Sequence, residues 1–454
     1  MSFAKKIVTL VLALAFVGCL VIKAQQPLSM KEKERYFPAN VYRVPDSNDY
    51  NDNNSEFSYQ RMIETPNFAA FWSKQYGDDP MANPNPAMRF NLKEALAEAE
   101  RFYSFFIDTL KFADRGNSST DKRKVLVYVI GSEEGGGTAF GGGSEDVGIF
   151  WTPPGRINKA PYATLAHELG HSFQFLVRAD GGNGARGSMA EMTSQYMLWQ
   201  VYPEWMTFEN YHLVDFMKQT HLAFLHPSNM YHTPYVLEYW SGKHGKDFVS
   251  RLWRESVEGE DAVTTYKRLN NVEQSDFNDE IFDACRRFIT WDMDRIRKVA
   301  SPYANQHFTS LVDAGNGWYR IDSTKCPQNY GYNGIQLEVP KPGTKIKLQF
   351  KGLAGNEGYS AHNVDKAGWR YGFVAYTHDG KRIYSKAQSA KEGTTSFRVP
   401  KNTQYLWLVV MGAPTQHWSI PMRRRGEQTE APKEEQWPYQ IKLAGTSVSA
   451  LMTD

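Results

Sequence analysis

Hydrophobic residues recur with helical spacing through much of the first two thirds of the chain. Residues 92–112 carry apolar side chains three or four positions apart, which predicts one long amphipathic helix. The same spacing dominates residues 161–300, including residues 235–244 and 246–255. We therefore expect this region to be mainly helical.

Short runs of a different kind lie among these helical segments. Residues 124–130 read Lys-Val-Leu-Val-Tyr-Val-Ile, and a β-branched run of this length is typical of a central strand. Further strands are expected at residues 57–62, 67–72 and 147–151. The first part of the chain is thus predicted to combine a sheet with helices.

The pattern changes near residue 306, where short aromatic and β-branched runs begin to alternate with turn signals such as Pro-Gly, Asp-Gly and Lys-Asn. The expected strands are residues 334–339, 345–350, 371–377, 395–399, 405–411 and 439–443. Such spacing predicts an antiparallel β-sandwich. The fold class is therefore α+β, with a mixed domain over residues 55–305 and a β-sandwich domain over residues 306–454.

Two glycine clusters, at residues 135–137 and 141–143, precede the strand expected at residues 147–151. One interpretation is a flexible loop that leads into the strand. The other is an edge strand that borders a cleft and binds an extended chain by strand addition. No Gly-Lys-Ser/Thr follows the glycines, which disfavours a phosphate-binding loop.

The first 24 residues predict a signal peptide. Two lysines precede an apolar stretch over residues 7–22, and Ala24 offers a small residue before the cleavage site. A membrane anchor is the first alternative, although the stretch is short for a span, and a lipoprotein acylated on Cys19 is the second. We expect cleavage after Ala24, a secreted or periplasmic protein with no transmembrane segment in the mature chain, and an irregular polar arm over residues 25–54.

Composition and charge narrow the class of protein. The chain is 41% hydrophobic and 22% charged, which is typical of globular proteins. Its formal net charge of +2 creates no field that would attract nucleic acid or an anionic membrane, so neither partner is implied. Only Cys285 and Cys326 remain after the leader, which allows at most one disulfide. Cys285 lies in a helical pattern and is expected to be buried.

The strongest chemical signal is the sequence His-Glu-x-x-His at residues 167–171. On a helix, His167 and His171 are one turn apart and project from the same face, so they can share one metal ion. Glu168 leans toward that side, where it can take a proton from metal-bound water. Apolar neighbours such as Leu165, Leu169 and Phe173 indicate a buried catalytic helix.

A catalytic zinc site uses three protein ligands, so a third ligand is required. The extended motif with a histidine six residues after His171 fails, because that position is Val177. The other well-known pattern takes a glutamate from the next helix, and Glu191 lies at a suitable distance in the sequence. Here the chain resembles the gluzincins, the thermolysin-like metallopeptidases, over roughly residues 124–255.

This resemblance implies a Zn²⁺ cofactor, an edge strand, a zincin-like metallopeptidase domain with a site on two helices, and proteolysis. The chain departs from the family after Glu191. Gluzincins commonly carry an acidic residue a few positions later that orients the first histidine, whereas this chain has Thr193, Ser194 and Gln195. The partner that orients His167 is therefore left unassigned.

Stabilisation of the transition state requires a further donor, and Tyr231 and His232 are the candidates, with Tyr231 preferred. Four other histidines have no partner at ligand spacing and are interpreted as surface or packing residues. They are His212, His221, His226 and His244.

The whole chain also looks like an exported bacterial family of unknown function. The resemblance rests on the zinc motif together with the segments at residues 368–374 and 436–439, and it supplies no activity. Five tryptophans of the second domain can either stack on a glycan or form its core. They are Trp318, Trp369, Trp407, Trp418 and Trp437.

These observations predict an exported zinc-dependent metallopeptidase that hydrolyses a protein, glycoprotein or peptide by Glu168-assisted attack of zinc-bound water. Two alternatives stay open. One is a secreted or cell-envelope protein that binds a glycan or a protein and has a non-catalytic zincin-like domain. The other is a zinc hydrolase of a non-peptide amide or ester, since water activation is common to both reactions.

Overall fold

The computed structural model describes residues 32–185, 187–209, 211–360, 362–420 and 434–453. The chain divides into two units, Met1–Glu32 and Lys33–Asp454, and the elements described below belong to the second. The predicted signal peptide, with Cys19 and Ala24, lies outside the described residues. Among the described helices, none combines the length and apolar character that a membrane span requires.

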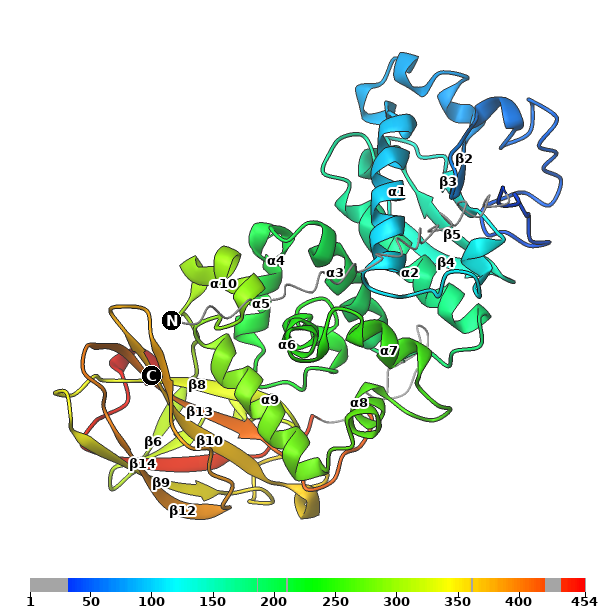
Figure 1. Ribbon diagram of the computed structural model, residues 1–454. Coiled ribbons are helices and arrows are strands. Elements are labelled where there is room, and N and C mark those ends of the chain that lie inside the picture. Colours follow the sequence, from blue (N-terminus) through cyan, green and yellow to red (C-terminus); the bar gives the residue numbers. More distant parts are fainter. Residues whose placement is uncertain (1–31, 186, 210, 361, 421–433, 454) are drawn as a thin grey trace, which may run out of the picture. The chain divides into compact units, whose positions relative to one another are not determined.

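The first half of the described chain builds a mixed five-stranded sheet of order β1–β2–β3–β5–β4 (Figure 1). Parallel pairs join β2 to β3 and β3 to β5, whereas the two outer strands pair antiparallel with their neighbours. The strands are β1 Met62–Glu64, β2 Phe68–Trp72, β3 Val125–Val129, β4 Phe140–Ser144 and β5 Val147–Thr152.

Every residue of β2, β3 and β5 is buried, because both faces of this sheet are covered. Helices α1 and α2 contribute apolar side chains to the cluster on one face. The irregular arm covers the other face, where Phe37, Val41 and Tyr50 pack against a separate apolar cluster. The described part of the arm, residues 32–54, contains no named helix or strand, and it completes the burial of the sheet.

Ten α-helices are described. They are α1 Leu92–Asp108, α2 Ala163–Ala179, α3 Met189–Val201, α4 Trp205–Phe208, α5 Tyr211–Lys218, α6 Tyr235–His244, α7 Phe248–Arg254, α8 Ala262–Asn270, α9 Gln274–Phe288 and α10 Asp294–Ala300. The predicted helical content of residues 161–300 is confirmed, and α6 begins and ends at the expected residues.

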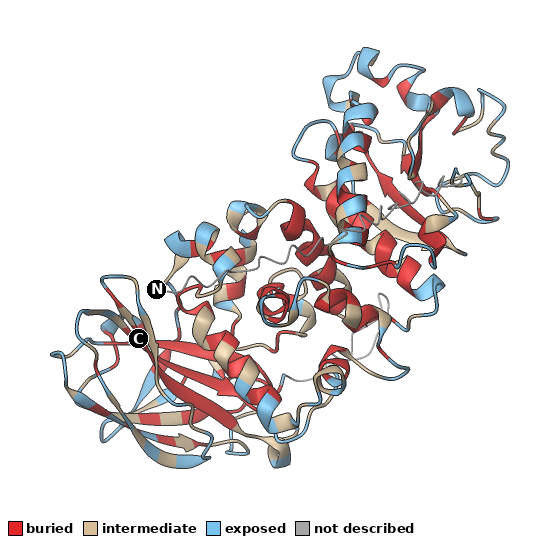
Figure 2. Ribbon diagram, viewed as in Figure 1, coloured by how far each residue is buried: buried red, intermediate tan, exposed pale blue. Residues whose placement is uncertain are grey.

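The remaining strands form two antiparallel sheets, of order β11–β10–β13–β8 and β12–β9–β14–β7–β6. Their bounds are β6 Leu311–Gly315, β7 Trp318–Ile321, β8 Tyr332–Leu337, β9 Lys345–Gly352, β10 Trp369–Thr377, β11 Arg382–Tyr384, β12 Glu392–Arg398, β13 Thr403–Gly412 and β14 Tyr439–Ala444. Figure 2 shows that β8, β10 and β13 are buried along much of their length. The second half is thus β-sandwich-like, and the described part of the chain is α+β.

Burial decides the role of three of the five tryptophans. Trp369, Trp407 and Trp437 are fully buried, so they are core residues and cannot stack on a sugar. Trp318 and Trp418 are partly exposed. A tryptophan platform built from all five residues is therefore excluded.

The boundary predicted at residue 305 remains a prediction. One cluster of buried side chains includes residues of the first sheet, of the helices and of the sandwich. At the junction, the thiol of Cys285 on α9 lies 3.7 Å from the sulfur of Met411 on β13, and Asn278 donates a hydrogen bond to the carbonyl of Pro414. Helix α9 therefore packs on the sandwich.

One predicted strand is wrong. Residues 57–62 were expected to be extended, but Tyr59–Arg61 forms a 3₁₀ turn and β1 begins only at Met62. The buried guanidinium of Arg61 donates hydrogen bonds to the carbonyls of Asn53 and Ser55, which holds the chain in this turn. The local apolar pattern carries no sign of these long side-chain contacts.

Candidate metal and catalytic site

Helix α2 places the His-Glu-x-x-His motif against the sheet. Its apolar residues, including Leu165, Leu169 and Phe173, are buried in the core. The hydroxyl of Ser172 donates a hydrogen bond to the carbonyl of Ile149 on β5, at 2.9 Å. Packing and this bond fix the rotation of the helix, so His167 and His171 lie on the face turned away from the core.

Helix α3 crosses α2 at close range because Gly170 has no side chain. A Cβ at Gly170 would lie 2.9 Å from the hydroxyl of Ser194 and 3.3 Å from its Cα. This approach brings Glu191 over both histidines. One oxygen of Glu191 lies 3.2 Å from Nε2 of His167 and 3.2 Å from Nε2 of His171.

The three side chains offer donor atoms that all lie within 4.8 Å of one another. Within the described part of the chain, no other group of three His, Cys, Asp or Glu side chains converges in this way. The structure thus brings together the three residues that the sequence predicted as metal ligands.

Two glutamines orient the imidazole rings. Oε1 of Gln195 lies 2.9 Å from Nδ1 of His167, and Oε1 of Gln174 lies 3.3 Å from Nδ1 of His171. The amide of Gln174 donates to the carbonyl of Ala190, so its oxygen is left as the acceptor. Both Nδ1 atoms therefore donate to these glutamine oxygens, and the Nε2 atom of each ring faces Glu191.

Gln195 fills the orienting role that the sequence left unassigned. It lies four residues after Glu191 on α3, so both side chains project from the same face of that helix. The sequence interpretation passed over Gln195 because it is not an anion. Its neutral amide oxygen can nevertheless occupy the same position as a carboxylate oxygen and accept the hydrogen bond from His167. The helical spacing from Glu191 was the signal that could have identified it.

Removing this acceptor is expected to weaken metal binding. We predict that Gln195→Ala lowers zinc affinity about 10–100-fold, because loss of a partner that orients a ligand has effects of that size. Gln195→Glu keeps an acceptor of the same length and should restore binding. Competitive titration with a zinc chelator measures both, and equal affinities for Gln195→Ala and wild type would contradict the role.

Glu191 and His171 shift each other's pKa values toward the charged forms. Burial disfavours the charged form of Glu191, but hydrogen bonds from both imidazoles outweigh it and hold the pKa of this carboxyl well below its usual range. Burial likewise opposes charge on His171, and the neighbouring Glu191 outweighs it, so the pKa of His171 is raised. Glu191 is thus an anion at neutral pH.

Glu168 is 8% exposed and lies beside the three converging residues. Burial raises the pKa of its carboxyl, and the charge of Glu191 acts in the same direction. The two histidines and a hydrogen bond from the backbone of Gly141 oppose this shift. A buried carboxylate with a raised pKa beside a cluster of candidate metal ligands has the properties expected of a general base.

Strand β4 passes directly over α2 because its central residues are glycines. A Cβ at Gly141 would lie 2.0 Å from the carbonyl oxygen of Glu168, and one at Gly143 would lie 2.2 Å from the ring of Phe175. Residues 140–144 form the outermost strand of the sheet, which corresponds to the edge-strand interpretation of the second glycine cluster. The edge strand therefore lies against the motif.

This close contact predicts a matched pair of substitutions. Gly141→Ala should lower the free energy of unfolding by about 1–3 kcal/mol, because the methyl group forces β4 away from Glu168. Gly142→Ala is the control, since a Cβ there meets no atom within 4 Å. Urea denaturation of both variants tests the difference, and equal stability of the two would show that β4 does not need this approach.

Of the two predicted stabilising residues, only Tyr231 faces the group. Its ring lies 6.4 Å from that of His167, and burial, the charge of Glu191 and a hydrogen bond to that carboxylate all raise the pKa of Tyr231. The phenol is therefore protonated at neutral pH. His232 turns elsewhere, with its Nδ1 2.9 Å from Nδ1 of His212.

His212 is a residue whose place the sequence interpretation missed. Its ring lies 6.2 Å from that of Tyr231, and its Nε2 lies 3.2 Å from a carboxylate oxygen of Glu209. His232 and His212 thus form a polar pair next to Tyr231. No sequence spacing relates these residues to the motif, because they come from separate segments.

Comparisons with known proteins give a family but no activity. No curated protein matches the sequence. Among solved structures, part of the chain is similar to the glycosylation associate protein complex from Streptococcus agalactiae, with 11% identity, a TM-score of 0.16, and coverage of 31% of this chain and 39% of that chain. A likeness at that TM-score carries no argument.

The model of a family of unknown function, DUF6055, matches residues 27–450. The expectation of a family of unknown function is thereby confirmed, whereas none of these comparisons supports a metallopeptidase family. Because the match extends over nearly the whole sequence, the chain belongs to the family of unknown function DUF6055.

Proposed function

We propose that this protein is a zinc-dependent metallopeptidase of the gluzincin type, with a zincin-like domain that holds Zn²⁺ on His167, His171 and Glu191. The observation that carries the proposal is the convergence of these three side chains within 4.8 Å beside Glu168. Two imidazole nitrogens and one carboxylate oxygen form a donor set that zinc commonly binds in catalytic sites. The two glutamines behind the imidazoles support the same assignment.

Zinc held by these ligands would supply Lewis acidity, which would acidify water and polarise a carbonyl oxygen. The protein supplies the proton transfers. Glu168 takes a proton from the attacking water and passes it to the leaving amine, and its raised pKa suits both steps. Burial of Glu168 also keeps bulk water from competing for that proton.

Tyr231 and β4 complete the proposed mechanism. The protonated phenol of Tyr231 can donate a hydrogen bond to the oxygen that gains negative charge during the attack. The free edge of β4 can pair with an extended peptide and hold its backbone in line with Glu168. A peptide or protein substrate is favoured, because an edge strand recognises a regularly spaced backbone.

We further propose that the protein acts outside the cytoplasm, as a secreted or periplasmic enzyme, since its sequence begins with the pattern of a signal peptide. Protein, glycoprotein and peptide substrates all fit an exported peptidase. A glycan bound to the sandwich would have to use groups other than the buried Trp369, Trp407 and Trp437.

Two measurements on the purified protein test the function. Metal content by mass spectrometry is expected to give one zinc per chain, and a broad peptide library is expected to be cleaved. A zinc chelator such as 1,10-phenanthroline should stop cleavage, and added zinc should restore it. Zinc without peptide cleavage would favour a non-peptide amide or ester substrate, and absence of zinc would favour the non-catalytic binding protein.

A further inference from the structure

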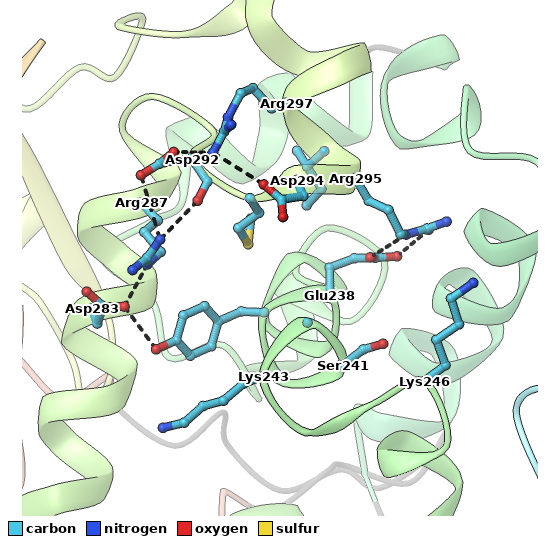
Figure 3. A pocket seen from close by; sticks show the side chains of 14 residues that line it. Glu238, Ser241, Lys243, Lys246, Asp283, Arg287, Asp292, Asp294, Arg295 and Arg297 are labelled. Carbon is cyan, nitrogen blue, oxygen red and sulfur yellow. Dashed lines mark hydrogen bonds and ion pairs between the residues drawn. The ribbon is translucent and has the colours of Figure 1, made fainter. Parts of the chain in front are cut away.

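A cavity of about 600 Å³ lies among α6, the end of α9 and α10, and none of its lining residues belongs to the proposed zinc site. Its size is within the roughly 300–1,000 Å³ of small-molecule sites. Five cationic and four anionic side chains line it. Figure 3 shows Glu238 with Arg295 on one side and Asp283 with Arg287 on the other.

The carboxylates of the cavity already have their partners. Glu238 is 5% exposed and accepts hydrogen bonds from Gln200, at 2.7 Å, and from two nitrogens of Arg295, at 3.0 and 2.8 Å. Asp283 accepts from Nε of Arg287 at 2.6 Å and from the phenol of Tyr239 at 3.0 Å. These two anions therefore have little capacity left for a ligand.

Asp292 is satisfied in the same way. Its oxygens accept from Nη2 of Arg297, at 2.5 Å, and from the phenol of Tyr384, at 2.7 Å. The fourth acid, Asp294, has a fully exposed side chain, and its Oδ1 lies 3.6 Å from Nη2 of Arg297. The acceptors inside the cavity are thus mostly consumed by the protein itself.

Some of the guanidinium donors, in contrast, have no acceptor in the described protein. Among the described residues, none accepts a hydrogen bond from Nη1 of Arg295, from Nη2 of Arg287 or from Nη1 of Arg297. Nε of Arg297 is buried and has no described partner, and a buried donor without an acceptor costs free energy. An acceptor-rich ligand would recover part of that cost.

Lys246 adds an uncompensated positive charge. Its ammonium lies 5.7 Å from the centre of the Phe105 ring, and no described carboxylate forms an ion pair with it. The other lysine of the cavity, Lys243, is paired with Glu280 at 2.5 Å. Partly buried Tyr239 and Met293 supply apolar contacts next to these donors.

We propose that this cavity binds a small organic anion, which presents a carboxylate, sulfate or phosphate to Arg295 and Lys246, drawn on the same side of the cavity in Figure 3. The apolar part of the ligand lies against Tyr239 and Met293. Anionic groups form the strongest hydrogen bonds with guanidinium and ammonium donors, and three of the four carboxylates already accept hydrogen bonds from the protein itself. The binding site is independent of the proposed peptidase activity.

Gly242 offers a way to block the cavity without disturbing the fold. It lies on α6 among the lining residues, and a Cβ at this position meets no atom within 4 Å. Gly242→Phe therefore fills open space. Lys246→Ala removes the uncompensated charge from an exposed side chain, and Lys298→Ala removes an exposed lysine from α10 that does not line the cavity.

Isothermal titration calorimetry of the full chain tests the proposal with four probes of similar size: glucose 6-phosphate, glucose 6-sulfate, glucuronic acid and uncharged glucose. At least one anion should bind with one site per chain at millimolar concentration or below, and glucose should not. Which of the three binds identifies the acid group. Lys246→Ala should weaken that binding about tenfold, Gly242→Phe should abolish it, and Lys298→Ala should leave it unchanged.

Three results would overturn the proposal: no binding of any of the three anions, equal binding of glucose, or full binding by Lys246→Ala. Circular dichroism checks whether Gly242→Phe is folded. If this variant is unfolded, the result for Lys246→Ala decides the test. Because the readout is binding and not cleavage, a failure here is distinguishable from a failure of the peptidase proposal.

Discussion

Glu168→Gln is expected to retain zinc and to lose peptide cleavage by a factor on the order of 10³, the size of a typical general acid–base contribution. Glutamine has the shape of glutamate but cannot take a proton from water. Glu168 is not among the three converging residues, so the metal group should be intact. Zinc content and kcat on one library-derived peptide measure the two effects separately.

The two readouts make this prediction specific. A variant that had merely unfolded would lose zinc together with activity, whereas a missing base removes activity alone. Glu204→Ala is a suitable control, because Glu204 is exposed and none of the described ion pairs includes it. If Glu168→Gln cleaved peptides at the wild-type rate, another residue would have to be the base.

Glu191→Ala is expected to lose stoichiometric zinc. Its carboxylate lies 3.2 Å from both imidazole nitrogens, and no other described acid converges on them within the same group. The loss of affinity should exceed the roughly 10–100-fold typical of partners that only orient a ligand. Mass spectrometry after dialysis against a chelator gives the metal content of the variant and the wild type.

Thermal unfolding provides a second measure of the same loss. A ligand that binds only the folded state raises the midpoint of unfolding, so added zinc should stabilise the wild type and have much less effect on Glu191→Ala. Glu204→Ala should respond to zinc as the wild type does. Full zinc occupancy of Glu191→Ala would show that the third ligand is wrongly identified.

The sequence predicted the candidate site best where local spacing determines geometry. Four residues separate His167 from His171, and one turn of α2 is enough to place both on one face. Most strands and helices were also predicted within a few residues, because their apolar periods are regular. The position of Glu191 required the resemblance to gluzincins, since spacing alone does not specify how α3 crosses α2.

Features that depend on tertiary contacts were harder to predict from the sequence. The close crossings at Gly141 and Gly170 follow from the packing of α2 against β4 and α3, and a sequence shows only that a glycine is present. The rotation that turns Tyr231 toward His167 and His232 toward His212 is decided by segments far apart in the chain. Burial of Trp407 likewise depends on a segment far away in the sequence, because its indole donates a hydrogen bond to the side chain of Asn305.

The two cysteines of the described chain have a practical consequence. Both are free and buried, and burial raises the pKa of the Cys326 thiol to about 12 and that of Cys285 well above its usual value. Neither is a thiolate at neutral pH, so alkylating reagents should react only after the chain opens. The rate of maleimide labelling therefore measures how fast the chain unfolds. Cys285 reports on the opening of α9, and Cys326 reports on the opening of the sandwich.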